Sequence, residues 1–344
     1  MSFTVKVQPS GLTFSVHEGQ SVLDAALEAK VLLPYSCRNG TCSTCKGKIV
    51  EGVVEAGDAP ANILEASEIQ QGYTLLCQAR AQSDLVIESP QAQVMSDIQV
   101  RKMPSRVIGI EQLSDDVAIL KVQLPAANPL YYYAGQYLDF LLKDGLRRSY
   151  SMATPPNEDN VVELHIRHLP GGVFTDQVFG VGETQLKERA ILRVEAPLGS
   201  FFLREESTKP IVMLASGTGF APIKAIIEHM QQHDIQRDVV LYWGGRRPRD
   251  LYMSELAESW ANTLPNFRFV PVISEALPDD NWTGRTGFVH HAVMHDLPDL
   301  SAYEVYACGA PIMVETARKD FVSQCHLPDE AFYADAFTSE ADAI

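Results

Sequence analysis

Four cysteines are the residues of this sequence with the clearest chemistry. Cys37, Cys42 and Cys45 share one short stretch with the spacing C-x4-C-x2-C, and Cys77 follows well downstream. In a [2Fe-2S] centre each iron takes two of its four sulfur ligands from cysteines, and one class of such centres has this spacing. Gly40 permits backbone conformations in which loop amides turn toward the bridging sulfides. The sequence therefore predicts a [2Fe-2S] centre with these four cysteines as its metal ligands.

Zinc and disulfide bonds are the alternatives for clustered cysteines. Structural zinc sites more often contain two C-x2-C pairs, whereas this chain has one. Residues 3–7 alternate apolar and polar side chains, and no basic region precedes an apolar core, so the N-terminus does not resemble a secretion signal. Intracellular thiols stay reduced, and clustered cysteines then indicate metal or redox chemistry. The pattern favours the iron-sulfur centre and a cytoplasmic location.

Composition and charge exclude several classes of protein. The 344 residues are 46% hydrophobic and 21% charged, which is an ordinary globular composition with material for two or three cores. No apolar run of about 18 residues predicts a membrane-spanning helix. The formal net charge of −16 argues against a nucleic-acid partner, because phosphate binding depends on clustered lysine and arginine. The acidity fits docking on a basic partner protein and equally fits an ordinary cytoplasmic protein.

The elements expected around the cysteines form a small module. Residues 3–7 and 12–16 alternate on either side of a turn, which predicts a β-hairpin. Ser21 is a typical N-cap for a helix over residues 22–30. The cysteine loop follows, and then a strand over residues 46–52. Hairpin, helix, metal loop and strand together predict a β-grasp unit.

This module resembles a plant-type ferredoxin over residues 1–92. The resemblance rests on Arg38, Asn39 and Gly40 between the first two cysteines and on the return segment around Cys77. Residues 93–103 are polar and irregular, which predicts a linker.

Two further domains are expected after the linker. Short strands at regular intervals, separated by Gly and Pro, predict an antiparallel barrel over residues 104–206. Over residues 207–344 strands alternate with helices, which is typical of a parallel α/β sheet. The expected fold class is multidomain α/β and β, with a β-grasp ferredoxin, an antiparallel barrel and a parallel α/β nucleotide domain that ends in a tail.

Three groups of residues in the barrel, 147–151, 165–167 and 171–175, carry a second resemblance. In this order, ahead of an α/β domain, they resemble the Arg-x-Tyr-Ser and Gly-x-x-Ser/Thr motifs of the ferredoxin-NADP reductase family. The resemblance covers residues 104–344 and implies a six-stranded barrel that binds FAD, with FMN as the alternative. The residues that it implies at the flavin are Arg148, Ser149, Tyr150, Ser151, His165, Ile166, Arg167, Gly172, Val173 and Thr175.

The same resemblance implies a role for each group. Arg148 would hold the pyrophosphate with a rigid guanidinium, for which lysine is a poor substitute. Tyr150 would lie flat against the isoalloxazine ring, and Ser151 would place its hydroxyl near N5, the atom that accepts hydride. Residues 165–167 would line the ribityl chain largely through their backbone. Residues 172–175 would present amides and a hydroxyl to phosphate oxygens at a helix start.

A glycine turn between a buried strand and a helix predicts a second nucleotide site. Amides and the helix dipole at such a turn favour a diphosphate. A Gly-x-Gly pair is weak evidence alone, but Pro222 replaces the third glycine of the ordinary fingerprint and resembles the reductase family's Gly-x-Gly-x-x-Pro. Cys308 opens a Cys-Gly-x-Pro motif whose cysteine, in that family, lies beside the reacting nicotinamide carbon. The residues implied here are Gly217, Thr218, Gly219, Pro222, Cys308, Gly309 and Pro311, and Cys308 joins Tyr150 and Ser151 as the predicted catalytic residues.

Coenzyme choice depends on the segment that contains Arg246, Arg247 and Asp250. An acidic residue that holds the ribose 2′-hydroxyl favours NADH, whereas arginines can accept the 2′-phosphate of NADPH. Both kinds are present, and the habits of ferredoxin-fused relatives favour NADH, with NADPH as the alternative.

Four further residues complete the candidates. Phe337 resembles the tail aromatic that covers the isoalloxazine ring in several such reductases, and a plain terminal strand is the alternative. His290 and His291 have no metal-ligand company in the sequence. Cys325 lacks any motif and is interpreted as a buried bystander.

The three modules predict an NAD(P)H-dependent oxidoreductase that passes electrons from NAD(P)H to FAD, to a [2Fe-2S] cluster and then to a protein acceptor. The cofactors carry the chemistry, and the protein supplies position and electrostatics. The chain resembles reductase components of multicomponent oxygenases and, more closely, the CDP-6-deoxy-3,4-glucoseen reductase type that serves a sugar dehydrase. A free-standing flavin reductase is the alternative function, and a non-catalytic zinc-binding scaffold is the alternative from another class. Neither a nucleic acid nor a membrane is expected as a partner.

Overall fold

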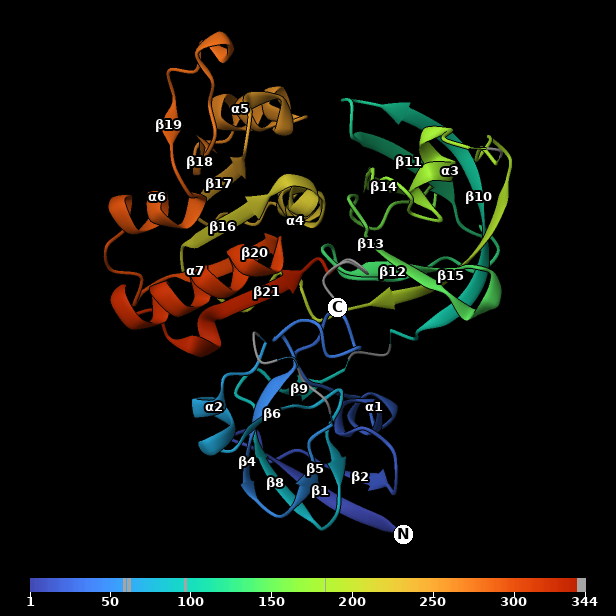
Figure 1. The fold of residues 1–344 in the computed structure, drawn as a ribbon, viewed down its shortest axis with the longest axis vertical. Helices are drawn as coiled ribbons and strands as arrows, with labels where there is room; N and C mark the ends of the chain where they lie inside the picture. The colour runs from blue at the N-terminus through green and yellow to red at the C-terminus, as the bar shows by residue number, and fades with distance from the viewer. Residues whose placement is uncertain (58–59, 61–62, 96–97, 183, 339–344) are drawn as a thin grey trace. The chain divides into compact units, whose positions relative to one another are not determined.

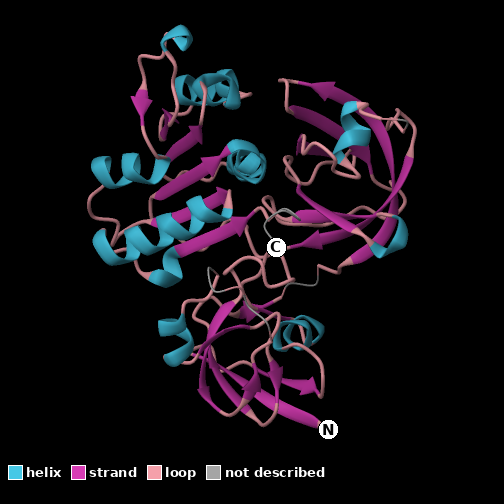
Figure 2. Cartoon of the chain, viewed as in Figure 1, coloured by secondary structure: helices cyan, strands magenta, loops and turns pink. Residues whose placement is uncertain are grey.

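The computed structural model describes residues 1–57, 60, 63–95, 98–182 and 184–338, and it divides the chain into two compact units. Unit 1 contains the described residues up to Ile98, the segment Gly199–Phe201 and the described residues from Ala334 onward. Unit 2 contains Gln99–Leu198 and Phe202–Tyr333. Figure 1 follows the chain through its elements, and Figure 2 distinguishes helices from strands.

Unit 1 has the β-grasp arrangement that the sequence predicts. Its elements are β1 (Ser2–Gln8), β2 (Thr13–His17), α1 (Val22–Glu28), β3 (Val31–Leu32), β4 (Lys46–Glu51), β5 (Val54–Glu55), α2 (Ala66–Gln70), β6 (Tyr73–Leu75), β7 (Arg80–Ala81), β8 (Leu85–Glu88) and β9 (Gln93–Val94). The main sheet has the order β2-β1-β8-β4-β6. The predicted hairpin is the antiparallel β1–β2 pair, and β8 pairs in parallel with β1.

Local contacts explain how helix α1 begins. Ser21 has extended backbone angles, and its hydroxyl accepts a hydrogen bond of 3.0 Å from the Asp24 amide, which confirms the predicted N-cap.

Two short ribbons, β3–β9 and β5–β7, complete unit 1. Within the stretch expected to be a linker, Gln93 and Val94 pair with β3, and a long strand already begins at Arg101.

The first half of unit 2 is a six-stranded antiparallel barrel, as expected. Its elements are β10 (Arg101–Gln112), β11 (Val117–Gln123), β12 (Tyr137–Leu141), η1 (Lys143–Gly145), β13 (Arg147–Ser151), β14 (Val161–Arg167), α3 (Thr175–Phe179) and β15 (Ile191–Leu198). The strand order is β13-β12-β15-β10-β11-β14, and an isolated bridge between Met152 and Leu164 joins its two ends. Apolar side chains from every strand, including Phe140, Leu138 and Ile166, fill the interior.

The second half of unit 2 is the predicted α/β domain. Its elements are β16 (Ile211–Ser216), η2 (Gly217–Gly219), α4 (Phe220–Gln232), β17 (Val239–Gly245), η3 (Pro248–Asp250), α5 (Ser254–Thr263), β18 (Phe267–Ile273), η4 (Pro278–Asp280), β19 (Arg285–Thr286), α6 (Val289–Asp296), β20 (Glu304–Gly309), α7 (Pro311–Gln324), η5 (Asp329–Ala331) and β21 (Phe332–Ala336). The sheet order is β19-β18-β17-β16-β20-β21, and β16 to β20 pair in parallel.

The connections of this sheet fix where a ligand can bind. Strand β16 lies between β17 and β20, so the chain leaves β16 to one side first and returns to its other side later. Right-handed crossovers then put α4 and α5 on one face and α6 and α7 on the other (Figure 1). Open sheets of this kind bind ligands at the carboxyl ends of the strands at such a switch point. No helix in the described part of the chain is long and apolar enough to cross a membrane.

Candidate functional site

The four predicted cluster ligands converge in unit 1. Strand β4 pairs with β6, and the Leu76 amide donates a hydrogen bond of 3.0 Å to the Cys45 carbonyl, which brings the two ends of the cysteine pattern together. The thiols of Cys37 and Cys42 are hydrogen-bonded to one another, and so are those of Cys45 and Cys77. Four sulfurs gathered from one loop and one return segment fit a [2Fe-2S] cluster.

The contact between Cys37 and Cys42 shifts the pKa values of the two thiols in opposite directions. The hydrogen bond with Cys42 lowers the pKa of Cys37 to about 5 against the opposing effect of burial, whereas the bond with Cys37 and burial both raise the pKa of Cys42. Thiolates are the form in which cysteine binds iron.

The cysteine loop is held in shape by its own polar contacts. Gly40 has φ +83°, and a Cβ there would lie 3.1 Å from Cγ of Gln78, so the predicted need for glycine is met by both conformation and space. Arg38 pairs with Asp24 at 2.7 Å. The Gln78 amide nitrogen lies 3.7 Å from Sγ of Cys77. These contacts link the cysteine loop to α1 and to the segment that carries Cys77.

The residues just before Cys37 are anchored to two distant segments of unit 1. The Tyr35 amide donates to Oγ of Ser200 at 2.8 Å, and the Gly199 amide donates to the Tyr35 hydroxyl at 2.9 Å. Ser36 donates its hydroxyl to Asp335 at 2.5 Å, and both side chains are buried. The entry to the cluster loop is therefore held by residues that the chain supplies much later.

Strand β13 sorts the Arg-Arg-Ser-Tyr-Ser residues onto two faces. Arg147 and Ser149 share one face, where Arg147 pairs with Asp139 and Glu195 and the Ser149 hydroxyl donates to Asp139 at 2.6 Å. Arg148 and Tyr150 lie on the other face because side chains alternate along a strand. Ser151 ends the strand and is buried. Only the second face offers a guanidinium and a ring together, as a bound flavin requires.

The Tyr150 ring packs against two other aromatic rings of the barrel. The Tyr150 ring lies 5.6 Å from Phe174 and 6.0 Å from Phe140, measured between centroids, and burial raises its pKa. A Cβ on Gly172 would come within 2.5 Å of Oγ1 of Thr175, so this loop turns tightly at glycine. The Thr175 hydroxyl itself donates to the Leu169 carbonyl at 2.9 Å. Val173, between them, is half-exposed. The loop is closed at its base and open at its tip.

The three residues of the third barrel group, His165, Ile166 and Arg167, lie in different surroundings. The His165 side chain is fully buried and contacts Tyr252 of the α/β domain, so any flavin contact from it must come through its backbone. Ile166 is buried in the barrel core. Arg167 lies beside Gly217 of the glycine turn, with its Nε 3.1 Å from Oδ2 of Asp116.

The glycine turn and the Cys-Gly-x-Pro motif meet at the carboxyl ends of β16 and β20. A Cβ on Gly219 would lie 2.1 Å from the Cys308 carbonyl oxygen, and one on Gly309, where φ is +132°, would lie 2.3 Å from Oγ of Ser216. The Ala310 amide donates to the same Ser216 hydroxyl at 3.0 Å. Thr218, Pro222 and Pro311 lie at the starts of η2, α4 and α7 around this point. Two helix starts with backbones in contact form a cradle that fits a dinucleotide.

Replacing Gly219 by alanine is expected to disrupt this cradle. The new methyl group would force the Cys308 backbone away, because the 2.1 Å approach is to a carbonyl oxygen and not to a flexible side chain. We expect Gly219→Ala to lower kcat/KM for NADH by about tenfold or more, since misplacement by 1 Å has that effect. Steady-state kinetics with ferricyanide measure it. Gly109→Ala is the control, because a Cβ there meets nothing within 4 Å, and an equal loss in both variants would contradict the prediction.

The segment after β17 arranges its arginines unequally. Arg247 makes a two-point ion pair with Asp280, with both N–O distances 2.6 Å. Asp250 is buried and accepts hydrogen bonds from the backbone amides of Arg246 and Arg247 at 2.8 and 3.0 Å. Hydrogen bonding to Arg247 lowers the pKa of Asp280 to about 2, so the pair stays charged at neutral pH. The guanidinium of Arg247 is thus neutralised locally.

Two candidates lie outside these groups. Phe337 is half-buried and directly follows β21, whose last residues belong to unit 1. Cys325 is buried at the end of α7, and burial raises its pKa, as expected of an inert thiol.

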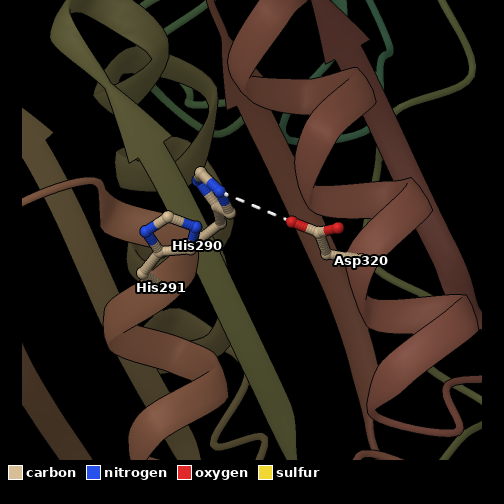
Figure 3. Close-up of side chains that lie close together, drawn as sticks. All are labelled: His290, His291 and Asp320. Atoms are coloured by element: carbon tan, nitrogen blue, oxygen red, sulfur yellow. Dashed lines mark ion pairs between the residues drawn. The ribbon is translucent and has the colours of Figure 1, made fainter.

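Asp320 of α7 lies near His290 and His291 of α6, and the spacing of these residues in the sequence does not reveal this proximity. His290 points toward Asp320 of α7, with Nε2 3.6 Å from Oδ2 (Figure 3). The ligand atoms of His290, His291 and Asp320 lie within 4.8 Å of one another. Burial lowers the pKa of His290, and the contact joins α6 to α7.

Known protein families match three successive parts of this chain. Three family profiles match in series: a 2Fe-2S iron-sulfur cluster binding domain over residues 5–82, an oxidoreductase FAD-binding domain over 104–203 and an oxidoreductase NAD-binding domain over 213–319.

Full-length relatives carry the comparison further. The CDP-6-deoxy-L-threo-D-glycero-4-hexulose-3-dehydrase reductase of Yersinia pestis is 41% identical over 98% of this chain and 99% of the relative. Reductase component 1 of the terephthalate 1,2-dioxygenase of Comamonas sp is 35% identical over 98% of each chain. The crystal structure of the Amycolatopsis cytochrome P450 reductase GcoB has a TM-score of 0.75 and 34% identity, covering 98% of this chain and 99% of that one.

The fold and its sites define an oxidoreductase with an iron-sulfur, a flavin and a nicotinamide-nucleotide module in one chain. The chain belongs to the family of ferredoxin-fused NAD(P)H reductases. It is an electron-transfer reductase that passes electrons from NAD(P)H through FAD and a [2Fe-2S] cluster to a protein acceptor.

The sequence did not identify three residues whose side chains hold the predicted site residues, or residues near them, in place. Tyr252, Lys224 and Asp335 each contact a predicted site residue or a residue near one. Lys224 and Asp335 are charged residues within apolar stretches, which was the only available signal, and Tyr252 has no such signal.

Proposed function

We propose that the protein acceptor of this reductase is a sugar-nucleotide dehydrase of the CDP-6-deoxy-hexulose type. The observation that carries the proposal is the 41% identity, along nearly the whole chain, to two Yersinia reductases named for such a dehydrase. When bound, FAD and the cluster supply the conversion of a two-electron donor into single-electron transfers. The chain supplies the sites, the spacing and the acceptor surface.

An oxygenase component is the second candidate acceptor. Terephthalate dioxygenase reductases of Comamonas are 35% and 36% identical over almost the same length, so the margin between the two groups is small. Both candidates require the same internal electron path and differ only in the partner. A free-standing flavin reductase would need no partner at all.

Reconstitution with purified partners tests the acceptor. The holoprotein is mixed with NADH and either a dehydrase and its sugar-nucleotide substrate or a terephthalate dioxygenase and its substrate. We expect NADH oxidation that depends on the dehydrase and yields its reduced product. Dependence on the oxygenase alone would support the second candidate, and equal NADH oxidation with neither partner would support the free-standing reductase.

The proposed residue roles follow the placements in unit 2. Arg148 binds the flavin pyrophosphate, Tyr150 packs on the ring, and Ser151 donates to N5. Cys308, beside the glycine turn, contacts the nicotinamide at the reacting carbon. The remaining flavin contacts from Ser149, residues 165–167 and residues 172–175 are assigned mainly to backbone, because the side chains of Ser149, His165 and Thr175 are already engaged.

The proposal also includes module boundaries, the tail and location. The modules are residues 1–92, 104–206 and 207–344, with 93–103 as linker, and the family profiles fall inside the three modules. Phe337 is proposed to cover the flavin ring. We place the protein in the cytoplasm, where NADH is available and thiols stay reduced.

NADH is the proposed coenzyme. The carboxyl end of the second strand of such a sheet is where the adenosine ribose is read, and here Arg247 is neutralised by Asp280 while Asp250 adds a further negative charge. A 2′-phosphate gains little from a guanidinium that is already paired. We expect kcat/KM for NADH to exceed that for NADPH by about tenfold, which corresponds to about 1.4 kcal/mol.

Removing the ion pair between Arg247 and Asp280 is expected to reduce the preference for NADH over NADPH. Asp280→Asn removes the paired charge, so kcat/KM for NADPH should rise by about tenfold while that for NADH changes little. Asp234→Asn is the control, because Asp234 is an exposed carboxylate with φ +53°, a conformation that asparagine accepts. A wild-type preference for NADPH, or the same ratio in both variants, would contradict the coenzyme proposal.

A further inference from the structure

A buried charged network joins the flavin barrel to the α/β domain inside unit 2. Lys224 lies on α4, one turn beyond the glycine turn, and is only 6% exposed. Its Nζ lies 3.4 Å from Oε1 of Glu163 on β14 and donates to the Ala153 carbonyl of the barrel at 3.1 Å. Glu228, one helical turn away, pairs with the same ammonium at 2.9 Å. Lys224 therefore carries a charge from the nucleotide domain to two barrel segments.

His165 extends the network to a second part of the α/β domain. Its Nε2 lies 3.0 Å from Oε1 of Glu163, and its Nδ1 lies 2.7 Å from the Tyr252 hydroxyl. An ionised carboxylate only accepts hydrogen bonds, so Nε2 carries the imidazole proton and Nδ1 accepts from Tyr252. Burial lowers the pKa of His165, so the ring stays neutral at physiological pH. Each polar atom of this ring thus has one defined partner.

The charges in the network depend on one another. Burial acts to raise the pKa of Glu163, but the hydrogen bond from His165 and the charge of Lys224 lower it to about 2. Removing the ammonium would leave the partly buried carboxylate of Glu163 with fewer partners, which is unfavourable. Such groups can serve to specify one arrangement of packed elements, because every alternative arrangement leaves a charge unpaired.

Aromatic stacking links this network to the glycine turn. The Tyr252 ring packs edge-on against Trp243 at 5.3 Å, and Trp243 stacks on Phe220, the first residue of α4, at 4.0 Å. Trp243 Nε1 donates to the Gly217 carbonyl at 3.0 Å. A displacement at Tyr252 or Lys224 is therefore transmitted to both ends of the glycine turn through close-packed groups.

We propose that Lys224, Glu163, His165 and Tyr252 are positioning residues that hold the glycine turn in register with the flavin-binding strand β14 and thereby set the rate of hydride transfer. They act on the reacting atoms through other residues, because their side chains form hydrogen bonds and ion pairs with one another. The inference rests on the proposed nicotinamide and flavin sites. It adds a determinant of rate that lies outside every motif of the sequence.

Lys224→Met tests the proposal in the holoprotein. The substitution keeps an unbranched side chain and removes the charge. We expect the limiting rate of flavin reduction by NADH, followed by anaerobic stopped-flow absorbance, to fall by about tenfold or more, because small misplacement of reacting groups has such effects. Half-saturation for NADH and flavin content should change by less than about twofold, since neither binding cradle is altered. Lys224→Arg should recover part of the rate.

Two further variants keep the test decisive. Lys121→Met is the matched control, because Lys121 also pairs with Glu163, at 3.7 Å, but its side chain is 43% exposed and it belongs to strand β11 of the barrel itself. Its rate should match wild type. Tyr252→Phe removes only the hydroxyl that donates to His165, and it should slow flavin reduction even if Lys224→Met fails to fold.

The possible outcomes separate this inference from the function itself. Wild-type rates in both Lys224→Met and Tyr252→Phe would overturn the positioning role and leave the reductase assignment intact. A rate in Lys121→Met as low as in Lys224→Met would also overturn it. A wild-type protein whose flavin is not reduced by NADH would instead contradict the reductase activity.

Discussion

Cys42→Ser is expected to abolish NADH-dependent reduction of cytochrome c while ferricyanide reduction continues. Cytochrome c accepts one electron at a time and is served by the cluster, whereas ferricyanide can take electrons directly at the flavin. Cys42 is buried beside Cys37 in the cysteine loop, and we propose its sulfur as one of the four cluster ligands. A serine hydroxyl is a far weaker ligand for iron, so the cluster should be lost or displaced.

The two assays must diverge for the result to support an ordered electron path. We expect cytochrome c activity to fall at least about a hundredfold and ferricyanide activity to stay within about twofold of wild type, because Tyr150, Ser151 and Cys308, the residues proposed for flavin and nicotinamide chemistry, belong to unit 2. Cys325→Ser is the matched control, since Cys325 is equally buried but lies at the end of α7. Loss of both activities in Cys42→Ser, with flavin retained, would contradict the order of carriers.

Arg148→Ala is expected to produce the second large effect, loss of bound flavin. Arg148 shares the Tyr150 face of β13, whereas Arg147 is committed to Asp139 and Glu195 on the opposite face. Each hydrogen bond to a charged group contributes about 1.5–3 kcal/mol, so losing the guanidinium should weaken flavin binding about ten- to a hundredfold.

Flavin released by denaturation and measured by absorbance checks this prediction. Arg106→Ala is the control, because Arg106 is exposed on β10 of the same barrel. Arg148→Lys should restore little, since an ammonium cannot reproduce the two-point contact. Full flavin content in Arg148→Ala would remove the pyrophosphate role while leaving the barrel assignment untouched.

Motif residues were predictable from the sequence because their geometry is local. The C-x4-C-x2-C spacing and the Gly-x-Gly-x-x-Pro turn specify short loops whose neighbours lie within a few residues, and strand periodicity gave the β-grasp hairpin and the barrel. The tight approach of Gly219 to Cys308 agrees with two motifs that were recognised separately.

Contacts between distant segments could not be predicted in this way. Glu163 and Lys224 meet only because β14 and α4 pack together, and Ser36 meets Asp335 after almost the whole chain has intervened. Neither periodicity nor local spacing encodes such pairs. Ser149 shows the same limit, because strand alternation turns its hydroxyl toward Asp139 and not toward the Arg148 face.

Anaerobic addition of NADH to the purified protein, monitored by low-temperature electron paramagnetic resonance, shows whether electrons from NADH reach the cluster. If one chain carries electrons from NADH through the flavin to its own cluster, the signal of a reduced [2Fe-2S] centre should appear in wild type and be absent from Cys42→Ser. Bleaching of the flavin without that signal in wild-type protein would contradict an electron path from the flavin to the cluster.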